Sequence, residues 1–196
     1  MMNQILLIRH GKTAGNIRRA YIGSTDEPLC PEGLKQMRLL SKEGLSAQRI
    51  ITSPMKRTIE SAAVLFPGMK SVPDPGLRET DFGVFEGKTA DEISSDPELG
   101  PLYSAWLDTG CQGPVPGGED IKSFKERVCS AFECQMAKIP ECATAAFVIH
   151  GGCIMAIMEK FAIPHHDFYH YHIANGAAIR CTWDGSHLEM TGGALC

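Results

Sequence analysis

The side chains best suited to chemistry in this sequence are two histidines and two arginines. Arg9 and His10 are adjacent near the start of the chain, while Arg57 and His150 lie far along it. Arginine binds phosphoryl oxygens through paired charge-assisted hydrogen bonds, and a histidine can attack phosphorus and carry the phosphoryl group covalently. A cavity that gathers these four side chains would therefore suit phosphoryl transfer.

Three buried strands must position these residues. Residues 5–8 and 143–149 are apolar runs that each end close to a histidine followed by glycine, and residues 49–52 lead into a helix with Arg57 in its first turn. Apolar runs of this kind are typical of strands inside a parallel sheet, and ligands bind outside the carboxyl ends of such strands. We therefore expect the four side chains to meet at one edge of one sheet.

The remaining pattern predicts an α/β protein, a three-layer α/β/α sandwich with a mostly parallel central sheet and an antiparallel edge strand. An apolar stripe over residues 119–139 predicts a long core helix, and an alternating tail over residues 169–190 predicts edge strands with tight turns. The other expected elements are a loop over 11–30, a helix over 31–44, a helix over 54–65 capped by Ser53, an ordered loop over 77–87 and a helix over 154–161. Residues 89–109 are expected to form short helices broken at Pro97 and Pro101, with Tyr103 and Trp106 as packing residues.

Length and composition limit the classes of function. The 196 residues fit a single domain over residues 1–196, and a net charge of −4 disfavours a nucleic-acid partner. No apolar run approaches the roughly 18 residues of a membrane helix, and no secretion signal is found, so we expect no membrane partner and a cytoplasmic protein. The eight cysteines contain no C-x-x-C pair and are expected to be reduced.

The residue pattern predicts no metal site and no cofactor. The sequence lacks the glycine loops that cradle nucleotides, and no cluster of carboxylates suggests Mg²⁺. His165, His166, His170 and His172 crowd one segment, and positions 170 and 172 would share one face of a predicted strand. No Cys, Asp or Glu at metal-ligand spacing accompanies them. Side chains must therefore neutralise the charge of a bound phosphoryl group.

Four motifs follow one another along the chain: Arg9-His10-Gly11-x-Thr13-x-x-Asn16, Ser53-Pro54-x-x-Arg57, Leu77-Arg78-Glu79-x-Asp81-Phe82-Gly83, and His150-Gly151-Gly152. In this order they resemble the histidine phosphatase superfamily, the phosphoglycerate-mutase-like clan. Residues 21–29 also resemble that family's substrate loop. The short chain, Tyr103-Ser104-Ala105-Trp106 and Pro116-Gly117-Gly118-Glu119 resemble the α-ribazole phosphatases of cobalamin assembly.

The resemblance implies a role for each matching residue. His10 would attack phosphorus and become phosphohistidine, and Glu79 would give a proton to the leaving alcohol and then activate water. The family's phosphate and substrate ligands fall on Arg9, Thr13, Asn16, Ile22, Gly23, Arg57, His150 and Gly151. Asp81 and Glu86 are expected to make loop hydrogen bonds. The implied function is a metal-independent phosphomonoesterase for a small phosphorylated metabolite, with α-ribazole 5′-phosphate as one candidate.

Two other functions stay open at this point. A phosphoglycerate mutase would pass the phosphoryl group to a second phosphorylated substrate, although the chain is short for the insertions that enclose both substrates. A non-catalytic phosphate-binding protein would lack the family's nucleophile or its acid, whereas His10, Glu79 and His150 are all present in this sequence. Lys12 departs from the Glu or Gln usual in the family, which leaves the substrate open, and the sequence neither indicates nor excludes a homodimer.

Overall fold

The centre of the fold is a mixed sheet, as seen in the computed structural model, which describes residues 2–193 and residue 195. Seven strands are arranged in the order β3-β2-β4-β1-β6-β7-β5. They are β1 (Asn3–Arg9), β2 (Arg49–Thr52), β3 (Ser71–Pro73), β4 (Thr144–Ile149), β5 (Ala162–Ile163), β6 (Ala178–Trp183) and β7 (Leu188–Met190). Since β1 pairs with β4 on one side and β6 on the other, the segment that ends at His10 is anchored from both sides.

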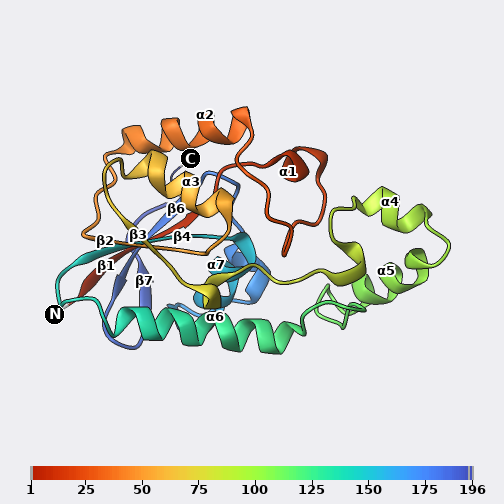
Figure 1. Ribbon diagram of the computed structural model, residues 1–196. Helices are drawn as coiled ribbons and strands as arrows, with labels where there is room; N and C mark the ends of the chain where they lie inside the picture. Colours follow the sequence, from red (N-terminus) through yellow and green to blue (C-terminus); the bar gives the residue numbers. More distant parts are fainter. Residues whose placement is uncertain (1, 194, 196) are drawn as a thin grey trace.

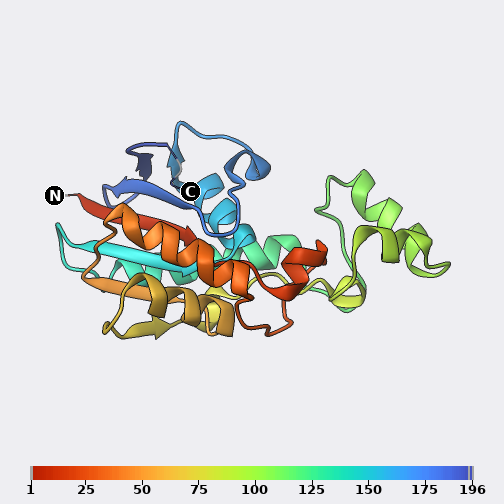
Figure 2. The same cartoon turned by 90° about the horizontal axis from the view of Figure 1, so that it is seen from above.

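Helices cover both faces of this sheet, with α2 and α3 on one face and α6 and α7 on the other (Figure 1, Figure 2). The three-layer α/β/α architecture is therefore confirmed. The α-helices are α1 (Ala14–Arg18), α2 (Pro31–Leu40), α3 (Lys56–Leu65), α4 (Ala90–Ser95), α5 (Leu99–Asp108), α6 (Ile121–Met136) and α7 (Gly151–Phe161), and the 3-10 turns are η1 (Ser41–Glu43), η2 (Pro75–Leu77), η3 (Gly83–Phe85) and η4 (Phe168–Tyr171). In the described part of the chain, no helix combines the length and the apolar character needed to cross a membrane.

Side chains of β1 join the two halves of the core. Leu6 and Ile8 pack with α2 and α3, whereas Ile5 and Leu7 pack with α6 and α7, and all of them are buried. Successive residues of a strand point to opposite faces, so a strand covered by helices on both sides must be apolar at consecutive positions. The apolar run at residues 5–8 predicted this burial on both faces, and the prediction is confirmed.

The strand that runs antiparallel to β1 is β6, and it lies inside the sheet rather than at the predicted edge. Leu7 of β1 faces Ile179 of β6, and β7 and β5 extend the sheet beyond β6. The start of the tail also differs from the prediction, because residues 168–171 form η4 instead of a strand. An alternating pattern reports which faces of a strand are buried, but it does not say which strands lie beside it.

The long core helix agrees with the predicted stripe, although it is shorter than 119–139. Asp120 caps it by accepting a hydrogen bond from the Ser123 backbone N–H at 2.9 Å, so the helix begins at Ile121. Its buried apolar stripe consists of Phe124, Val128, Phe132 and Met136. The seven cysteines within the described residues are all unpaired.

Three segments near the predicted site have helix starts that the sequence interpretation missed. The segment over 11–30 was predicted to be a loop throughout, yet Thr13 and Asn16 form a capping box that opens α1. After β2, Ser53 Oγ accepts a hydrogen bond from the Met55 N–H at 3.3 Å, which forms a turn and delays the start of α3 to Lys56 instead of Pro54. α7 begins at residue 151, earlier than the predicted 154.

A small unit made of η3, α4 and α5 projects from one end of the sheet (Figure 1, Figure 2). Phe85, Ile93, Tyr103 and Trp106 form its buried cluster, so the packing role predicted for the last two is confirmed. Pro101 does not break the helix as predicted, because it lies in the first turn of α5, where a backbone N–H has no intrahelical acceptor.

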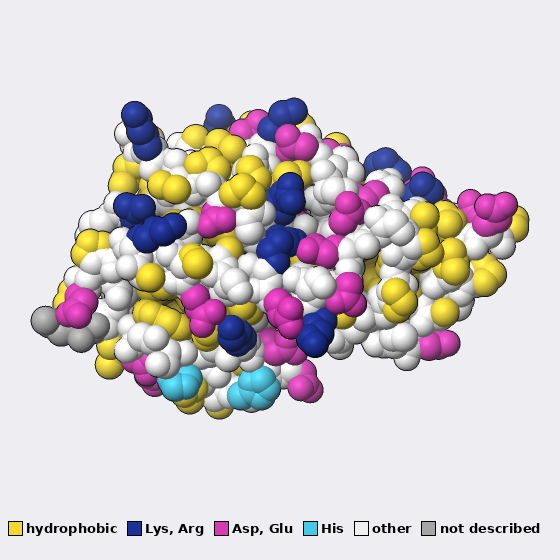
Figure 3. All heavy atoms as spheres, turned by 60° about the horizontal axis from the view of Figure 1, so that its bottom comes forward, with side chains coloured by type: hydrophobic (Ala, Val, Ile, Leu, Met, Phe, Trp, Pro, Cys, Tyr) yellow, Lys and Arg dark blue, Asp and Glu magenta, His cyan; other side chains and the backbone are white. Residues whose placement is uncertain are grey.

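The surface mixes charges of both signs. On the face seen in Figure 3, Lys and Arg side chains are interspersed with Asp and Glu, and hydrophobic side chains gather at the end formed by α4 and α5. Two ion pairs, Lys125–Glu159 at 2.7 Å and Lys160–Glu133 at 3.2 Å, link α6 to α7. Such pairs contribute little stability when they are exposed, so the apolar layer between the two helices supplies most of it.

Two glycines set the position of the loop that follows His10. A Cβ on Gly11 would come within 2.6 Å of the Gly33 carbonyl oxygen, and a Cβ on Gly33 would collide with the backbone of Lys12. The loop therefore lies directly against the first turn of α2. Cys30 caps that helix as predicted, by accepting from the Gly33 N–H at 3.4 Å.

Gly33→Ala should push this loop away from α2. We expect the free energy of unfolding to fall by about 1–3 kcal/mol, the range for forcing extra atoms into a packed site. Urea denaturation measures the loss. Gly192→Ala is the matched control, because nothing described lies within 4 Å of the added Cβ. Equal stability of the two variants would contradict this close packing.

Candidate active site

The carboxyl ends of β1, β2 and β4 bring three of the predicted residues together. The ring centroids of His10 and His150 lie 5.2 Å apart in an edge-to-face arrangement. Arg57 Nε donates a hydrogen bond to His150 Nδ1 at 3.2 Å. All three side chains are buried. Because parallel strands end at the same edge of a sheet, segments far apart in the sequence form one cluster here.

His10 has one ring nitrogen occupied and the other free to react. Its Nδ1 lies 2.7 Å from the Gly11 carbonyl oxygen, and since a carbonyl can only accept, Nδ1 carries the proton. The Nε2 lone pair is therefore available. Burial, and then the charge of Arg57, hold the pKa of His10 well below its usual value. The ring is thus neutral at neutral pH, which a nucleophile requires.

Two buried N–H donors beside His10 have no hydrogen-bond acceptor among the described residues. His150 accepts at Nδ1 from Arg57, so its proton is on Nε2, and this group is unpartnered, as is Arg9 Nε. Burial and the Arg57 charge also hold the pKa of His150 well below its usual value. Buried polar groups are nearly always hydrogen-bonded, so two free donors next to a nucleophilic ring suit an anionic ligand.

Arg57 ties the cluster to the loop between α1 and α2. Its Nη1 donates to the Thr25 carbonyl at 2.7 Å, and its Nη2 donates to the Gly23 carbonyl at 2.8 Å. The Gly23 N–H donates in turn to Glu86 Oε1 at 2.9 Å. Both backbone polar groups of Gly23 are therefore engaged within the protein. Glu86 makes the loop hydrogen bonds predicted for it.

Thr13, Asn16 and Ile22, the other residues of the predicted phosphate and substrate loops, all have contacts within the protein. Asn16 Oδ1 accepts from the Thr13 N–H at 3.1 Å and from Asn175 Nδ2 at 3.3 Å, which leaves the Asn16 Nδ2 group as a donor. Asn175 Nδ2 also lies 3.3 Å from the His10 carbonyl oxygen, so Asn16 is held close to His10. Ile22 packs against Gly15, where no Cβ would fit.

Glu79 lies beside the start of α7. Its Oε2 accepts a hydrogen bond from the Gly152 N–H at 3.0 Å, and its Oε1 accepts from the Thr80 N–H at 3.1 Å. Burial raises the pKa of Glu79, against the opposing effects of these two N–H groups and of the Arg9 and Arg57 charges. A carboxyl group with a raised pKa can hold a proton that it later donates.

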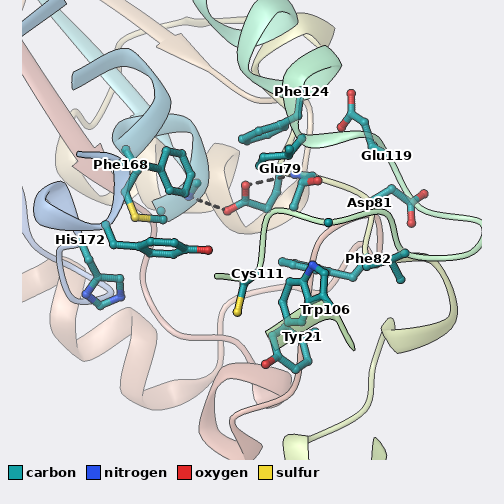
Figure 4. A pocket seen from close by; sticks show the side chains of 18 of the residues that line it. Tyr21, Glu79, Asp81, Phe82, Trp106, Cys111, Glu119, Phe124, Phe168 and His172 are labelled. Atoms are coloured by element: carbon teal, nitrogen blue, oxygen red, sulfur yellow. Dashed lines mark hydrogen bonds between the residues drawn. The ribbon is translucent and has the colours of Figure 1, made fainter. Parts of the chain in front are cut away.

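A cavity of about 380 Å³ opens beside Glu79 and Arg9 (Figure 4). Several aromatic side chains line it, and Tyr21, Phe82 and Trp106 contact one another edge to face or tilted along one wall. Further aromatic side chains in the lining are Phe124, Phe168 and Tyr169, and its ionisable side chains include Arg9, Glu79, Asp81, Glu119, His172 and Cys111. The lining therefore combines apolar side chains with acidic and basic groups, and the carboxylate of Glu119 is paired with Arg127 at 2.6 Å.

The aromatic wall is the part of the site that sequence reasoning missed. Tyr21, Phe82 and Trp106 come from three segments that meet only in the folded chain, and Trp106 was interpreted as a packing residue alone. It packs in the cluster of α4 and α5 and also lines the cavity. The signal in the sequence was the presence of Tyr21 and Phe82 in segments with no helical or strand period, whereas Trp106 lies in a predicted helix and gave no such signal.

The contacts of two further side chains, Lys12 and Asp81, bear on the sequence predictions. Lys12, which was left open, forms an ion pair with Glu32 at the surface and is thereby directed toward the first turn of α2. Asp81 makes the predicted loop hydrogen bond, because its Oδ1 accepts from the Gly83 N–H at 2.8 Å. Asp81 also lines the cavity.

The histidines of the tail do not share a strand face as predicted. The rings of His166 and His170 stack with centroids 3.9 Å apart, whereas His172 Nε2 lies 3.2 Å from Arg9 Nη1. The cause is η4, which gives residues 168–171 a helical turn in place of an extended strand. Throughout the described residues, no three His, Cys, Asp or Glu side chains are grouped so that they could hold a metal ion.

Comparison with known proteins gives the family. A model described as histidine phosphatase superfamily (branch 1) matches residues 5–192. The chain belongs to this superfamily. The match extends from β1, which ends next to His10, past the last strand, β7, so it includes every segment of the site.

Relatives within the histidine phosphatase superfamily carry different names. A protein of Serratia proteamaculans named probable phosphoglycerate mutase GpmB is 33% identical over 165 residues, which cover 79% of this chain and 74% of that protein. A putative alpha-ribazole-5'-P phosphatase structure from Escherichia coli K-12 has a TM-score of 0.84 at 22% identity, covering 95% of this chain and 93% of the other. A phosphoglycerate mutase structure from Thermus thermophilus has a TM-score of 0.72 at 28% identity, covering 98% of each chain. The superfamily thus fixes the fold but leaves the substrate open.

Glu79→Gln tests the raised pKa of the buried carboxyl group. When folding raises the pKa of a group, the protonated form stabilises the fold, and this contribution is lost as the pH rises through the folded-state pKa. Between about pH 5 and about pH 8 the wild type should lose stability relative to Glu79→Gln. The loss should be about 1.4 kcal/mol for each unit by which the pKa of Glu79 in the folded state exceeds its pKa in the unfolded state. Urea denaturation of both proteins at the two pH values measures this difference. A difference that is independent of pH would contradict the raised pKa.

Proposed function

We propose that this protein is a metal-independent phosphomonoesterase that works through a phosphohistidine at His10. The observation that carries the proposal is the free Nε2 lone pair of His10 beside two N–H donors, Arg9 Nε and His150 Nε2, that have no partner in the described part of the chain. Phosphoryl transfer depends mostly on positioning and charge stabilisation, and the guanidinium groups of Arg9 and Arg57 supply the positive charge. Membership of the histidine phosphatase superfamily supports the same reaction.

In the first half-reaction a bond forms between nitrogen and phosphorus. His10 Nε2 attacks phosphorus with its lone pair, the bond from phosphorus to the ester oxygen breaks, and the leaving oxygen takes the proton of the Glu79 carboxyl group. Arg9 and Arg57 balance the charge on the nonbridging oxygens, and the Nε2–H of His150 donates to one of them.

In the second half-reaction water releases the phosphate. The Glu79 carboxylate accepts a proton from water as the water oxygen attacks phosphorus, and the bond to His10 Nε2 breaks with its electron pair returning to the ring. Further donors to the phosphoryl oxygens are the Asn16 amide, the Thr13 hydroxyl and the Gly151 N–H. Gly151 is the first residue of α7, where a backbone N–H has no intrahelical acceptor.

The substrate in this proposal is the phosphate ester of an uncharged, flat alcohol, with α-ribazole 5′-phosphate as the leading candidate. The cavity next to Glu79 supports it, because Tyr21, Phe82 and Trp106 offer aromatic faces to a planar group. The Asp81 carboxylate in the same lining would repel a second anionic group, whereas Glu119 is paired with Arg127 at 2.6 Å. The partner of this site is therefore a small phosphorylated molecule.

Phosphoglycerate mutase activity is the second candidate, and the relatives named probable phosphoglycerate mutase favour it. That reaction requires a second anionic substrate to accept the phosphoryl group from His10. The Asp81 carboxylate in the cavity lining weighs against it, because it disfavours a second anionic group there. Isomerisation of 3-phosphoglycerate distinguishes the two reactions.

Hydrolysis of p-nitrophenyl phosphate in EDTA tests the proposed reaction. We expect turnover in EDTA, and a loss on the order of 10³-fold or more in His10→Ala, because removal of a nucleophile abolishes the covalent route. His165→Ala, an exposed histidine outside the site, is the matched control and should retain activity. Acid-labile phosphate should accumulate on the wild type and not on His10→Ala. Tight binding of phosphate without any turnover would instead indicate a binding protein.

Phe82→Leu tests the aromatic wall. The side chain is half-buried and lines the cavity, and leucine keeps its apolar character while removing the ring. For α-ribazole 5′-phosphate we expect kcat/KM to fall by about three- to tenfold, the range for losing one aromatic contact. For glycerol 2-phosphate, which is too small to need that wall, kcat/KM should be unchanged. Equal losses for both esters would show that the wall does not select the leaving group.

A further inference from the structure

Arg9 is held by a part of the chain that lies far from it in sequence. Its Nη1 donates to the Ile173 carbonyl at 2.7 Å and lies 3.2 Å from His172 Nε2. Arginine has no acceptor, so His172 Nε2 must accept this hydrogen bond. The proton of the neutral ring is then on Nδ1, and the contact exists only while His172 is neutral.

This contact determines which edge of the Arg9 guanidinium group is free. Nη1 is occupied by the segment of residues 172–173, whereas Nε is buried without a partner in the described part of the protein. Nε and Nη2 form one edge of the planar group, and this edge matches two oxygens of a phosphoryl group. A Cβ on Gly151 would lie 3.1 Å from Arg9 Cζ, so the guanidinium group also lies flat against the start of α7.

We propose that His172 is a positioning residue that holds Arg9 with its Nε–Nη2 edge toward the phosphoryl group, and that protonation of His172 releases this hold. The inference rests on the proposed function, because it assigns the anion at this edge to the transferred phosphoryl group. His172 lines the mouth of the cavity and is exposed, so it can exchange protons with solvent (Figure 4).

The charges around His172 give the direction of its pH dependence. Burial, and then the positive charge of Arg9, lower the pKa of His172 below its usual value, so the ring is neutral at neutral pH and charges on the acid side. Protonation then removes the acceptor and places a cation beside Arg9. The other ionisable side chains of the cavity are Tyr21, Cys111 and Glu79, each with a pKa raised by burial, Tyr169, with a pKa raised to about 12, Asp81 and Glu119.

A purely structural role for His172 makes a different prediction. The hydrogen bond from Arg9 to the Ile173 carbonyl involves the main chain and persists when residue 172 is replaced. A structural residue would change thermal stability without changing the affinity for phosphate. A positioning residue changes phosphate affinity and turnover, and an uncharged acceptor restores them.

The experiment compares His172→Ala, His172→Gln and the control His170→Ala, an exposed residue outside the cavity. Inorganic phosphate is the probe for calorimetric titration, and p-nitrophenyl phosphate is the substrate. In His172→Ala we expect phosphate affinity and kcat/KM to fall by about five- to tenfold at pH 7.5. Glutamine should restore both to within about twofold, because its amide oxygen accepts at a similar reach. His170→Ala should match the wild type.

The pH profile is the second readout. Between about pH 7 and about pH 5.5 the wild type should lose more phosphate affinity than His172→Gln, because glutamine cannot be protonated in this range. His10, His150 and the phosphate ion titrate in both proteins, so their effects cancel in the ratio of the two affinities. This comparison remains decisive if a melting curve shows that His172→Ala is unfolded.

Two outcomes overturn the inference: phosphate affinity of folded His172→Ala equal to that of the wild type, or identical pH profiles for the wild type and His172→Gln. The experiment also distinguishes failure of this inference from failure of the proposed phosphomonoesterase activity. If the wild type hydrolyses no ester but binds phosphate with the pattern expected above, His172 positions Arg9 in an anion site, and the phosphomonoesterase proposal alone is rejected.

Discussion

The site depends on one buried cation, Arg57. Its guanidinium group donates to His150 Nδ1 and to the carbonyls of Gly23 and Thr25, so it joins β4, α3 and the loop after α1. A buried charge is tolerated when it is hydrogen-bonded and compensated, and loss of a partner costs much more than the intact arrangement contributes. Arg57 therefore holds these three segments together, and the tautomer of His150 follows from the same contact.

Burial moves the pKa values of the ionisable groups of the site in opposite directions, because it disfavours the charged form of each group. Burial together with Arg57 lowers the pKa values of His10 and His150, and burial raises the pKa of Glu79 despite nearby arginines. The result at neutral pH is a pair of neutral imidazoles next to a carboxyl group that can hold a proton. Groups whose environments push their pKa values apart are suited to complementary tasks, and the tasks proposed for them are those of nucleophile and proton donor.

The two ends of a phosphate ester would meet different parts of the fold. The phosphoryl end faces the ends of β1 and β4 and the start of α7, which are fixed by the central sheet. The alcohol end would face a cavity lined mainly by residues outside the sheet, from α5, α6, α7, η4 and the loops that hold Tyr21 and Phe82. Since loops and small appended units tolerate change better than central strands, the leaving group can vary among relatives while the phosphoryl site persists.

The amino-acid sequence by itself determined the layers, the central strands and the meeting of His10, Arg57 and His150, because apolar runs and the residues that end them are local patterns with direct consequences for a parallel sheet. It did not determine the position of β6 inside the sheet, the aromatic wall of the cavity or the hydrogen bond from Arg9 to His172. Only the tertiary structure decided these, because each depends on contacts between residues far apart in the chain, such as Leu7 with Ile179, which leave no periodic signal along the sequence.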